Sequence, residues 1–508
     1  MDKKIIIIGA GPTGLGAAYR LKQLGYKNFA LYDCHPEIGG LASSFKDAAG
    51  FTWDIGGHVM FSHYKYYDDV FDELMGSDFQ LNMRESWVRM FERWVPYPFQ
   101  NNIHKLPGEV ACECLVDLIE AQSKRDPKKA QNFEEFIDAV FGDGIGKYFM
   151  KPYNFKVWAH PPAMMNKEWI GERVAVIDLK RAIRSVVMNS DDVGWGPNNQ
   201  FKYPLTGGTG EFYRRFAKPL EGHVHLNKSL DFVNLARKEV RFSDGQIEHF
   251  DELISTVPLD ILCNNMVNGE MPRELKKKAA SLKHSGGYMV GIGIRQPCPS
   301  TKSWMYFPES NSPFYRVTYL SNYSPNMTPD NKTHYSLLCE TSYSEHKPVD
   351  GSRIVEDTIQ GLINSGLLAE NDRPDIVSTW VYNARYSYPI PTLERDRILA
   401  EVIPYLENHN VYSRGRFGMW KYEVSNTDHS LMQGVELVNR LILDEPEVTV
   451  GIKYATTDDG RNAAKHVRSE FAGSGEKRAA SSSVPRMAPI SEEEIGVTFE
   501  ADQEQDDK

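Results

Sequence analysis

Apolar runs at the start of the chain predict a strand, a helix and a second strand. Four consecutive isoleucines at residues 5–8 have the length and composition of a fully buried strand. A glycine-rich turn at residues 9–14 follows, and the small and apolar residues after it predict a helix. A second short strand ends at Asp33. A helix that connects two strands in this way predicts a parallel βαβ unit.

The segment from residue 107 to residue 187 has the periodicity of helices. One helix face is expected to carry Phe133, Phe136, Ile137, Val140 and Phe141. Asn132 and Glu135 lie where a capping pair would begin this helix. Residues 148–158 then contain more aromatic and polar side chains than a simple core stripe needs. We therefore expect a helical domain here, inserted into the first domain.

Other regions predict strands and turns. Residues 223–256 contain short apolar segments with an Asp244-Gly245 hairpin turn, and we expect them to rejoin the first domain. Residues 194–210 are rich in turn-forming residues and are interpreted as a connection back to that domain. Residues 411–430 predict a strand, a glycine turn and the start of a helix. Strands of a separate sheet are predicted at residues 286–294, 333–341 and 376–382.

Three glycines after the first strand are spaced for binding the pyrophosphate of a dinucleotide. Gly9 permits a tight turn, Gly11 lets the backbone approach the pyrophosphate, and Gly14 lets the helix pack close to the sheet. Asp33 follows at the distance expected for a carboxylate that binds a ribose 2′-hydroxyl. A glycine turn without a ligand is the alternative, but the surrounding pattern favours a nucleotide. A second glycine pair at residues 39–40 favours FAD over NAD.

Further features fit both a ligand site and a plain structural role. Gly56 and Gly57 could place a mobile loop and His58 beside a ligand ring, although their spacing alone favours a turn next to a surface histidine. Residues 94–102 fit either a pocket rim that stacks a base or a structural loop. Arg173 stands alone, which is typical of a solvated face. Tyrosines and arginines near the ends of the predicted sheet strands are the donors that a diphosphate site needs.

Composition narrows the class of protein. A chain of 508 residues is expected to form two or three domains. The 69 acidic and 58 basic residues give a net charge of −11, which argues against a partner that is a nucleic acid. The six cysteines contain no C-x-x-C pair and are interpreted as reduced thiols. No apolar run has the length of a signal peptide or a membrane span, so we expect a soluble, cytoplasmic protein.

These patterns predict an α/β protein with a Rossmann-type FAD-binding domain, a helical insertion domain and an antiparallel β-sheet domain. The discontinuous FAD-binding domain is expected at residues 1–83, 206–283 and 395–471, and the helical insertion domain at 104–195. The sheet domain, which would bind the substrate, is expected at residues 84–103, 196–205 and 284–394. Residues 472–508 hold nine acidic and four basic residues, a net of −5, and predict a disordered acidic tail.

Five motifs together resemble the eukaryotic UDP-galactopyranose mutases, and the resemblance extends to about residue 470. The motifs are residues 56–64 (GGHVMFSHY), 95–102 (VPYPFQNN), 150–158 (MKPYNFKVW), 413–418 (SRGRFG) and 422–426 (YEVSN). The resemblance implies an isomerase that interconverts UDP-galactopyranose and UDP-galactofuranose, in galactofuranose biosynthesis, without net redox change. The N5 atom of reduced FAD would act as the nucleophile on the anomeric carbon, and NADPH would be the reductant. A homo-oligomer is also possible, and no membrane partner is expected.

The resemblance also implies roles for individual residues, and it reverses the plain interpretations of His58, Arg173 and Arg316. These three would be catalytic, and the two arginines would clamp the diphosphate with Tyr306, Tyr388 and Tyr422. The uridine would contact Tyr97, Gln100, Phe149, Asn154 and Trp158, and the galactose would contact Asn198 and Trp304. The FAD site would include Gly9, Gly11, Thr13, Gly14, Asp33, Gly40, Leu41, Gly56, Gly57, Leu230, Arg416, Asn426, Thr427 and Ser430. Arg84 and Ser86 would bind the NADPH phosphate, and no metal is expected.

Some features depart from the resemblance or leave other functions open. Thr427 stands where a glutamine is expected, and residues 454–458 are unlike the motif of the mutases. Leu230 fits core packing as well as an adenine contact. An ordinary FAD oxidoreductase related to the amine oxidases, and a flavin-bearing sensor of UDP-sugars, are the two rival hypotheses.

Overall fold

The computed structural model describes residues 3–170, 177–192, 199–267 and 271–451. All of them belong to one compact unit, residues 1–469. Arg173, Asn198 and the predicted acidic tail lie outside the described residues. None of the described helices is long and apolar enough to cross a membrane. All six cysteines lie in the described part and are free thiols.

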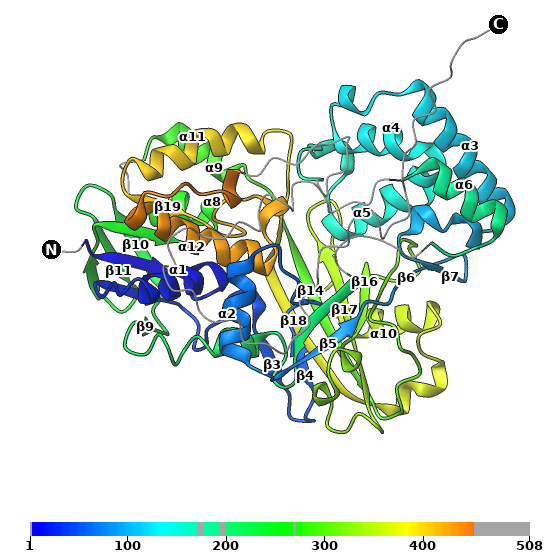
Figure 1. The fold of residues 1–508 in the computed structure, drawn as a ribbon, viewed down its shortest axis with the longest axis horizontal. Helices are drawn as coiled ribbons and strands as arrows, with labels where there is room; N and C mark the ends of the chain where they lie inside the picture. Colours follow the sequence, from blue (N-terminus) through cyan, green and yellow to red (C-terminus); the bar gives the residue numbers. More distant parts are fainter. Residues whose placement is uncertain (1–2, 171–176, 193–198, 268–270, 452–508) are drawn as a thin grey trace, which may run out of the picture. The chain divides into compact units, whose positions relative to one another are not determined.

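A five-stranded parallel sheet begins with the predicted βαβ unit. Its strand order is β19 (Val411–Ser413), β13 (Glu252–Ser255), β1 (Ile5–Ile8), β2 (Phe29–Tyr32) and β9 (Val224–His225). The first and last helices in the described chain, α1 (Pro12–Gln23) and α12 (Thr427–Leu443), pack against each other. Segments from both ends of the described part of the chain therefore build one Rossmann-type layer (Figure 1).

A three-stranded antiparallel sheet shares the core of this layer. Its strands are β10 (Leu230–Asn234), β11 (Glu239–Phe242) and β12 (Ile247–His249). The predicted hairpin turn at Asp244-Gly245 connects the last two strands, and Gly245 has the positive φ of 89° that such a turn requires. Leu230 is buried in this core, so the structure gives it a packing role.

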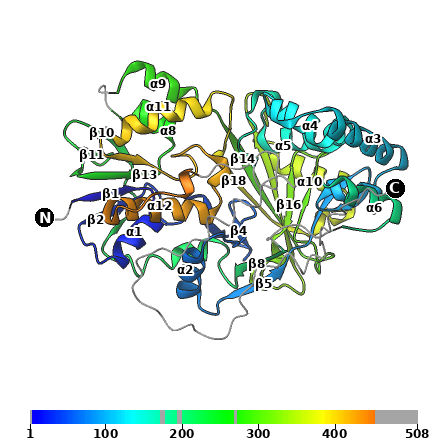
Figure 2. The ribbon, with the colours of Figure 1, turned by 45° about the horizontal axis from the view of Figure 1, so that its top comes forward.

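Helices α3 (Gly108–Lys124), α4 (Phe133–Ile145), α5 (Lys151–Trp158) and α6 (Leu179–Met188) gather together in Figures 1 and 2. The predicted capping pair is confirmed, because Glu135 N donates to Asn132 Oδ1 at 2.9 Å. The predicted apolar face of α4 is also confirmed, since Phe133, Phe136 and Phe141 are buried in the helical core.

A seven-stranded sheet lies beside the helices (Figure 2). In order, its strands are β18 (Ile376–Pro389), β14 (His284–Ile294), β17 (Tyr335–Tyr343), β16 (Arg316–Tyr319), β15 (Trp304–Tyr306), β6 (Ser86–Met90) and β7 (Arg93–Pro96). Neighbours are antiparallel except for the parallel pair β15 and β6. The three strands predicted from apolar runs are the three at one edge of this sheet.

The described chain also contains two small sheets and six further α-helices. The helices are α2 (Lys65–Met75), α7 (Gly210–Arg214), α8 (Leu259–Ile261), α9 (Arg273–Ala280), α10 (Ile354–Asn364) and α11 (Arg395–Glu407). β3 (Ser44–Lys46) pairs with β4 (Thr52–Asp54), and β5 (Phe79–Met83) pairs with β8 (Gln200–Pro204). The turn-rich interpretation of residues 194–210 is therefore wrong for β8. Its alternating buried and half-buried residues form a strand because β5 supplies the partner.

Candidate active site

A cavity of about 310 Å³ collects residues from many distant segments. It lies among the loop after β4, the ends of several strands of the seven-stranded sheet, and the start of α12. The predicted site residues that line it are Leu41, Gly56, Gly57, His58, Arg84, Tyr97, Trp304, Tyr306, Arg316, Tyr388, Arg416, Tyr422, Asn426 and Thr427. The structure thus brings together residues that the sequence separates by almost four hundred positions.

Two glycine segments meet at the N-terminus of α1. Gly11 is the N-cap residue, and no side chain caps the helix. A Cβ on Gly40 would lie 3.1 Å from Gly11 Cα, so the two backbones face each other without side chains between them. An uncapped helix N-terminus in a glycine cradle is suited to bind a pyrophosphate. Gly9 and Gly14 form the turn and the close helix contact that the motif predicts, while Thr13 is buried on α1.

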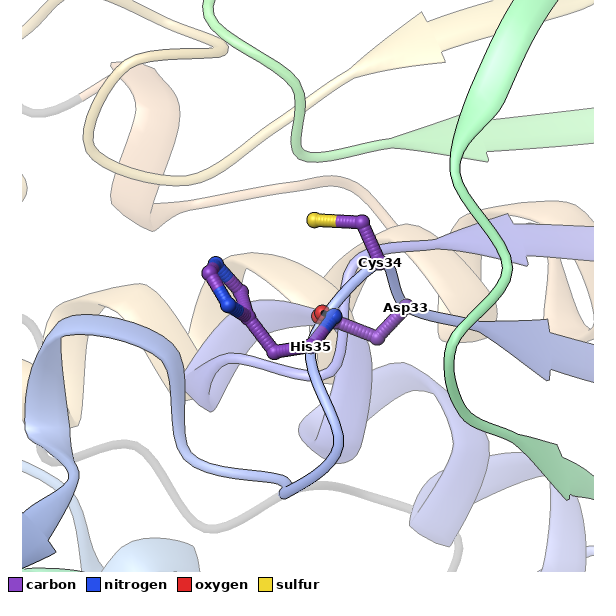
Figure 3. A group of neighbouring side chains, drawn as sticks. All are labelled: Asp33, Cys34 and His35. Atoms are coloured by element: carbon purple, nitrogen blue, oxygen red, sulfur yellow. Dashed lines mark hydrogen bonds between the residues drawn. The ribbon is translucent and has the colours of Figure 1, made fainter. Parts of the chain in front are cut away.

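Asp33 lies at the end of β2, as the sequence predicts. Its Oδ2 accepts a hydrogen bond from Ala10 N at 2.6 Å, and its Oδ1 accepts one from His35 N at 2.8 Å. Figure 3 shows Asp33 with the adjacent Cys34 and His35, whose ligand-type atoms lie within 4.8 Å of one another. One carboxylate oxygen thus holds the glycine turn at Ala10 and the other holds the loop after β2 at His35, so the position of Asp33 is explained without a metal ion.

The Gly56–Gly57–His58 loop is attached to two strands of different sheets. Gly57 N donates to Glu340 Oε1 at 3.1 Å. Further along, Met60 exchanges two backbone hydrogen bonds with Lys202 of β8, at 3.1 and 3.0 Å. His58 lies between these attachments and lines the cavity. Its Nδ1 atom is buried and has no hydrogen-bond partner in the described part of the chain.

The half-buried Arg316 and the buried Glu340 form an ion pair across neighbouring strands β16 and β17. Arg316 Nε donates to Glu340 Oε1 at 2.6 Å, and Arg316 Nη2 donates to Oε2 at 2.8 Å. Tyr315 Oη donates to Oε2 at 2.8 Å. Burial alone would raise the pKa of the Glu340 carboxyl, but the charge of Arg316 and these hydrogen bonds hold it below its usual value. The guanidinium is thus held in one orientation beside the cavity.

Aromatic side chains form a wall of the cavity. Trp304 Nε1 donates to Tyr306 Oη at 2.7 Å. Tyr388 and Tyr422 contact each other edge to face, with ring centroids 5.5 Å apart, and Trp158 packs against both. The other residues predicted for uridine, Gln100, Phe149 and Asn154, are buried in the adjoining helical region. These contacts give a ligand base large apolar surfaces with a few hydroxyl groups.

Arg84 links the main cavity to a smaller one of about 150 Å³. Its Nε donates to Ser86 Oγ at 3.0 Å. Its guanidinium lies over two aromatic rings, 5.1 Å from the centroid of Tyr97 and 5.0 Å from that of Trp304. Arg84, Ser86 and Tyr97 line the smaller cavity. This arrangement combines a fixed positive charge with a surface for stacking.

Comparison with known proteins assigns the family. The model of the flavin containing amine oxidoreductases matches residues 12–408. A crystal structure of reduced UDP-galactopyranose mutase is 44% identical, with a TM-score of 0.87, and the match covers 92% of this chain and 98% of that one. The chain belongs to the UDP-galactopyranose mutases of this flavoprotein family. The resemblance seen in the sequence and the predicted fold class are both confirmed.

Two more distant proteins are also similar to this chain. Putrescine oxidase with bound putrescine is 15% identical with a TM-score of 0.59, over 87% of this chain and 99% of that one. The 4,4'-diaponeurosporene oxygenase of Staphylococcus aureus is 21% identical over 374 residues, which are 68% of this chain and 73% of that protein. The likeness to putrescine oxidase shows a shared fold.

The protein is therefore a flavoenzyme, and the residues present fit FAD. The glycine cradle at α1 suits its pyrophosphate, and Asp33 is close enough to the cradle to bind the adjoining ribose. A second helix, α12, begins at the cavity with Asn426 as its N-cap and without a side-chain cap. Arg416 lies beside it and donates to the carbonyl oxygens of Ser387 and Ser425. Ser430, in the first turns of α12, is buried.

His58 provides a test of this site that depends on pH. Burial and the neighbouring Arg416 lower the pKa of His58 to about 3. Below pH 6.5 His58 takes up a proton in the unfolded chain but stays neutral in the folded protein, so this residue lowers the free energy of unfolding as the pH falls. For His58→Gln, we expect the loss in free energy of unfolding between pH 7 and pH 5 to be smaller by about 2 kcal/mol. Urea unfolding at both pH values measures this.

The matched control is His249→Gln, because the side chain of His249 is 71% exposed. We expect that variant to lose stability with falling pH as the wild-type protein does. If His58→Gln also behaves like the wild-type protein, His58 is not held in its neutral form.

The prediction of site residues was incomplete. Sequence reasoning missed Glu340, and it also missed Phe61 and Gln200, which line the cavity. Glu340 is the one charged residue in strand β17, and that is the signal that marks it. The proposed roles of Arg173 and Asn198 stay predictions, because both residues lie outside the described ranges.

Proposed function

We propose that the protein interconverts UDP-galactopyranose and UDP-galactofuranose without net redox change. The observation that carries this proposal is the orientation of Arg316. Glu340 accepts hydrogen bonds from one edge of the Arg316 guanidinium. Arg316 also lines the same cavity as the Gly56–His58 loop. An oriented arginine beside a flavin site is suited to bind the diphosphate of a nucleotide sugar. The match to UDP-galactopyranose mutase supports this choice of substrate.

Some side chains of the cavity would bind the substrate, and others would stabilise the charge that develops during the reaction. Arg316 would stabilise the negative charge that grows on UDP as the glycosidic bond breaks, and Tyr388 and Tyr422 would add neutral donors. The aromatic wall would hold the uridine and exclude water. His58 stays neutral at physiological pH because its pKa is low, so it would contact the flavin ring without adding charge. Reduced FAD would supply the nucleophilic nitrogen for this chemistry.

NADPH is proposed as the source of reducing equivalents, with Arg84 and Ser86 at its 2′-phosphate. Arg84→Ala removes a charged donor to that phosphate, and such a donor contributes about 1.5–3 kcal/mol. We therefore expect the KM for NADPH to rise about 10- to 100-fold, while the KM for NADH rises much less. Flavin reduction, followed by its absorbance under anaerobic conditions, measures both constants. An equal rise in the KM for NADPH and for NADH would show that Arg84 does not recognise the 2′-phosphate.

The number of products formed per NADPH tests the proposed function against its rivals. A mutase reduces its flavin once and then turns over many times, so the moles of product should exceed the moles of NADPH consumed. An ordinary oxidoreductase would consume one NADPH, or another redox partner, for each product. A sensor would bind UDP and form no product. Anaerobic incubation with limiting NADPH distinguishes the three.

A further inference from the structure

The carboxylate of Glu340 is shared between the flavin loop and the arginine of the diphosphate site. Its Oε1 atom accepts from both Gly57 N at 3.1 Å and Arg316 Nε at 2.6 Å. Its Oε2 atom accepts from Arg316 Nη2 and Tyr315 Oη, each at 2.8 Å. The side chain is only 1% exposed, so these four donors supply nearly all of its hydrogen bonding. A shift of either partner must therefore change the hydrogen bonding of the other.

The loop lies tightly against the strand that carries Arg316. A Cβ added to Gly57 would lie 2.8 Å from Thr318 Oγ1 and 3.4 Å from Glu340 Oε1. Thr318 is on β16, two residues after Arg316. Because no side chain separates the loop from β16, Gly57 can follow small displacements of Glu340. Close contacts of this kind transmit a displacement of one group to the group packed against it.

Charge provides the driving force for such a displacement. Arg316 uses its Nε and Nη2 atoms to hold Glu340, and its side chain lines the cavity. A diphosphate in the cavity would attract the guanidinium and so compete with Glu340 for it. As Arg316 shifts toward the ligand, Oε1 loses part of one donor and its bond to Gly57 N strengthens.

We propose that Glu340 is a positioning residue that couples diphosphate binding at Arg316 to the position of the Gly57 loop beside the flavin. This inference rests on the proposed function, because it needs a nucleotide diphosphate in the cavity. By linkage, the coupling is reciprocal. A loop position that strengthens the Gly57 bond to Glu340 raises the affinity of Arg316 for the diphosphate. The cofactor site would thereby sense whether a nucleotide is bound.

Titration of the FAD-loaded protein with UDP tests the coupling, with two readouts. The dissociation constant reports binding, and the flavin difference spectrum at saturating UDP reports the loop. Glu340→Gln keeps the shape of the side chain, but its amide group faces the donors Arg316 Nη2 and Tyr315 Oη, so it cannot accept from all four donors. We expect its affinity for UDP to fall at least tenfold and its difference spectrum at saturation to lose most of its amplitude.

Two further variants separate coupling from folding. Glu340→Asp keeps the charge but is one methylene shorter, so it cannot reach Gly57 and Arg316 together, and it should also lose the spectral change. Glu436→Gln is the matched control, because Glu436 is also a buried carboxylate but binds Val448 and Thr449. This variant should keep the wild-type affinity for UDP and the wild-type flavin difference spectrum. Wild-type affinity and amplitude in both Glu340 variants would overturn the coupling, whereas a wild-type protein that binds no UDP would overturn the proposed function as well.

Discussion

Replacing Arg316 with alanine is expected to lower kcat/KM by about 30- to 1,000-fold, which corresponds to about 2–4 kcal/mol of lost transition-state stabilisation. Two hydrogen bonds to Glu340 orient the Arg316 guanidinium beside the cavity. Its removal also leaves a carboxylate that is 1% exposed without its counter-charge. The free energy of unfolding should therefore fall by about 3–5 kcal/mol. Steady-state kinetics and urea unfolding measure the two effects.

Two variants serve as controls for this prediction. Arg316→Lys keeps the charge but loses the planar guanidinium that donates two hydrogen bonds to Glu340. Its kcat/KM and its free energy of unfolding should therefore lie between those of the wild-type protein and Arg316→Ala. Arg373→Ala removes an arginine from surface ion pairs with Glu356 and Glu370, and its stability should change by less than about 1 kcal/mol. If Arg316→Ala keeps both kcat/KM and stability, Arg316 takes no part in the reaction.

Replacing Gly14 with alanine is expected to abolish FAD binding and to destabilise the first domain by about 3 kcal/mol or more. A Cβ at this position would lie 1.8 Å from the carbonyl oxygen of Gly9 and 3.3 Å from Ile7 Cγ2. The nearest atom belongs to the backbone, so the helix must move away from β1 and open the cradle at Gly11. The ratio of flavin to protein absorbance and the thermal unfolding midpoint measure the result.

Gly108→Ala is the matched control for this substitution. Gly108 is the first residue of α3, and no atom lies within 4 Å of the Cβ that would be added there. This variant should bind FAD normally and should be unchanged or more stable by about 0.5–1 kcal/mol. Equal flavin content in the two variants would show that close packing at Gly14 is not required.

The first βαβ unit could be predicted from the sequence because its signals are local. The isoleucine run, the glycine spacing and the position of Asp33 lie within about thirty residues, and the structure forms the strand, turn and helix that they predict. The same holds for α4, whose cap at Asn132 and buried face of phenylalanines follow from spacing alone. Local patterns of this kind determine the elements before any tertiary contact is known.

Glu340 could not be predicted, because its role depends on pairing between strands. It lies 24 residues after Arg316 and 283 residues after Gly57, and only the register of β16 and β17 places it opposite Arg316. β8 was missed for a similar reason, since its partner β5 is more than a hundred residues away in the sequence. Sequence periodicity can indicate a strand, but it does not identify the partner strand that completes a sheet or a site.

The most direct test of the proposed function is the conversion of UDP-galactofuranose by the purified protein. One sample is reduced under anaerobic conditions, a second is left oxidised, and the nucleotide sugars are separated by chromatography. The proposed function predicts that UDP-galactopyranose appears in the reduced sample alone, with no other product. Conversion that is equal in the oxidised sample, or no conversion in a reduced sample that binds UDP, would contradict it.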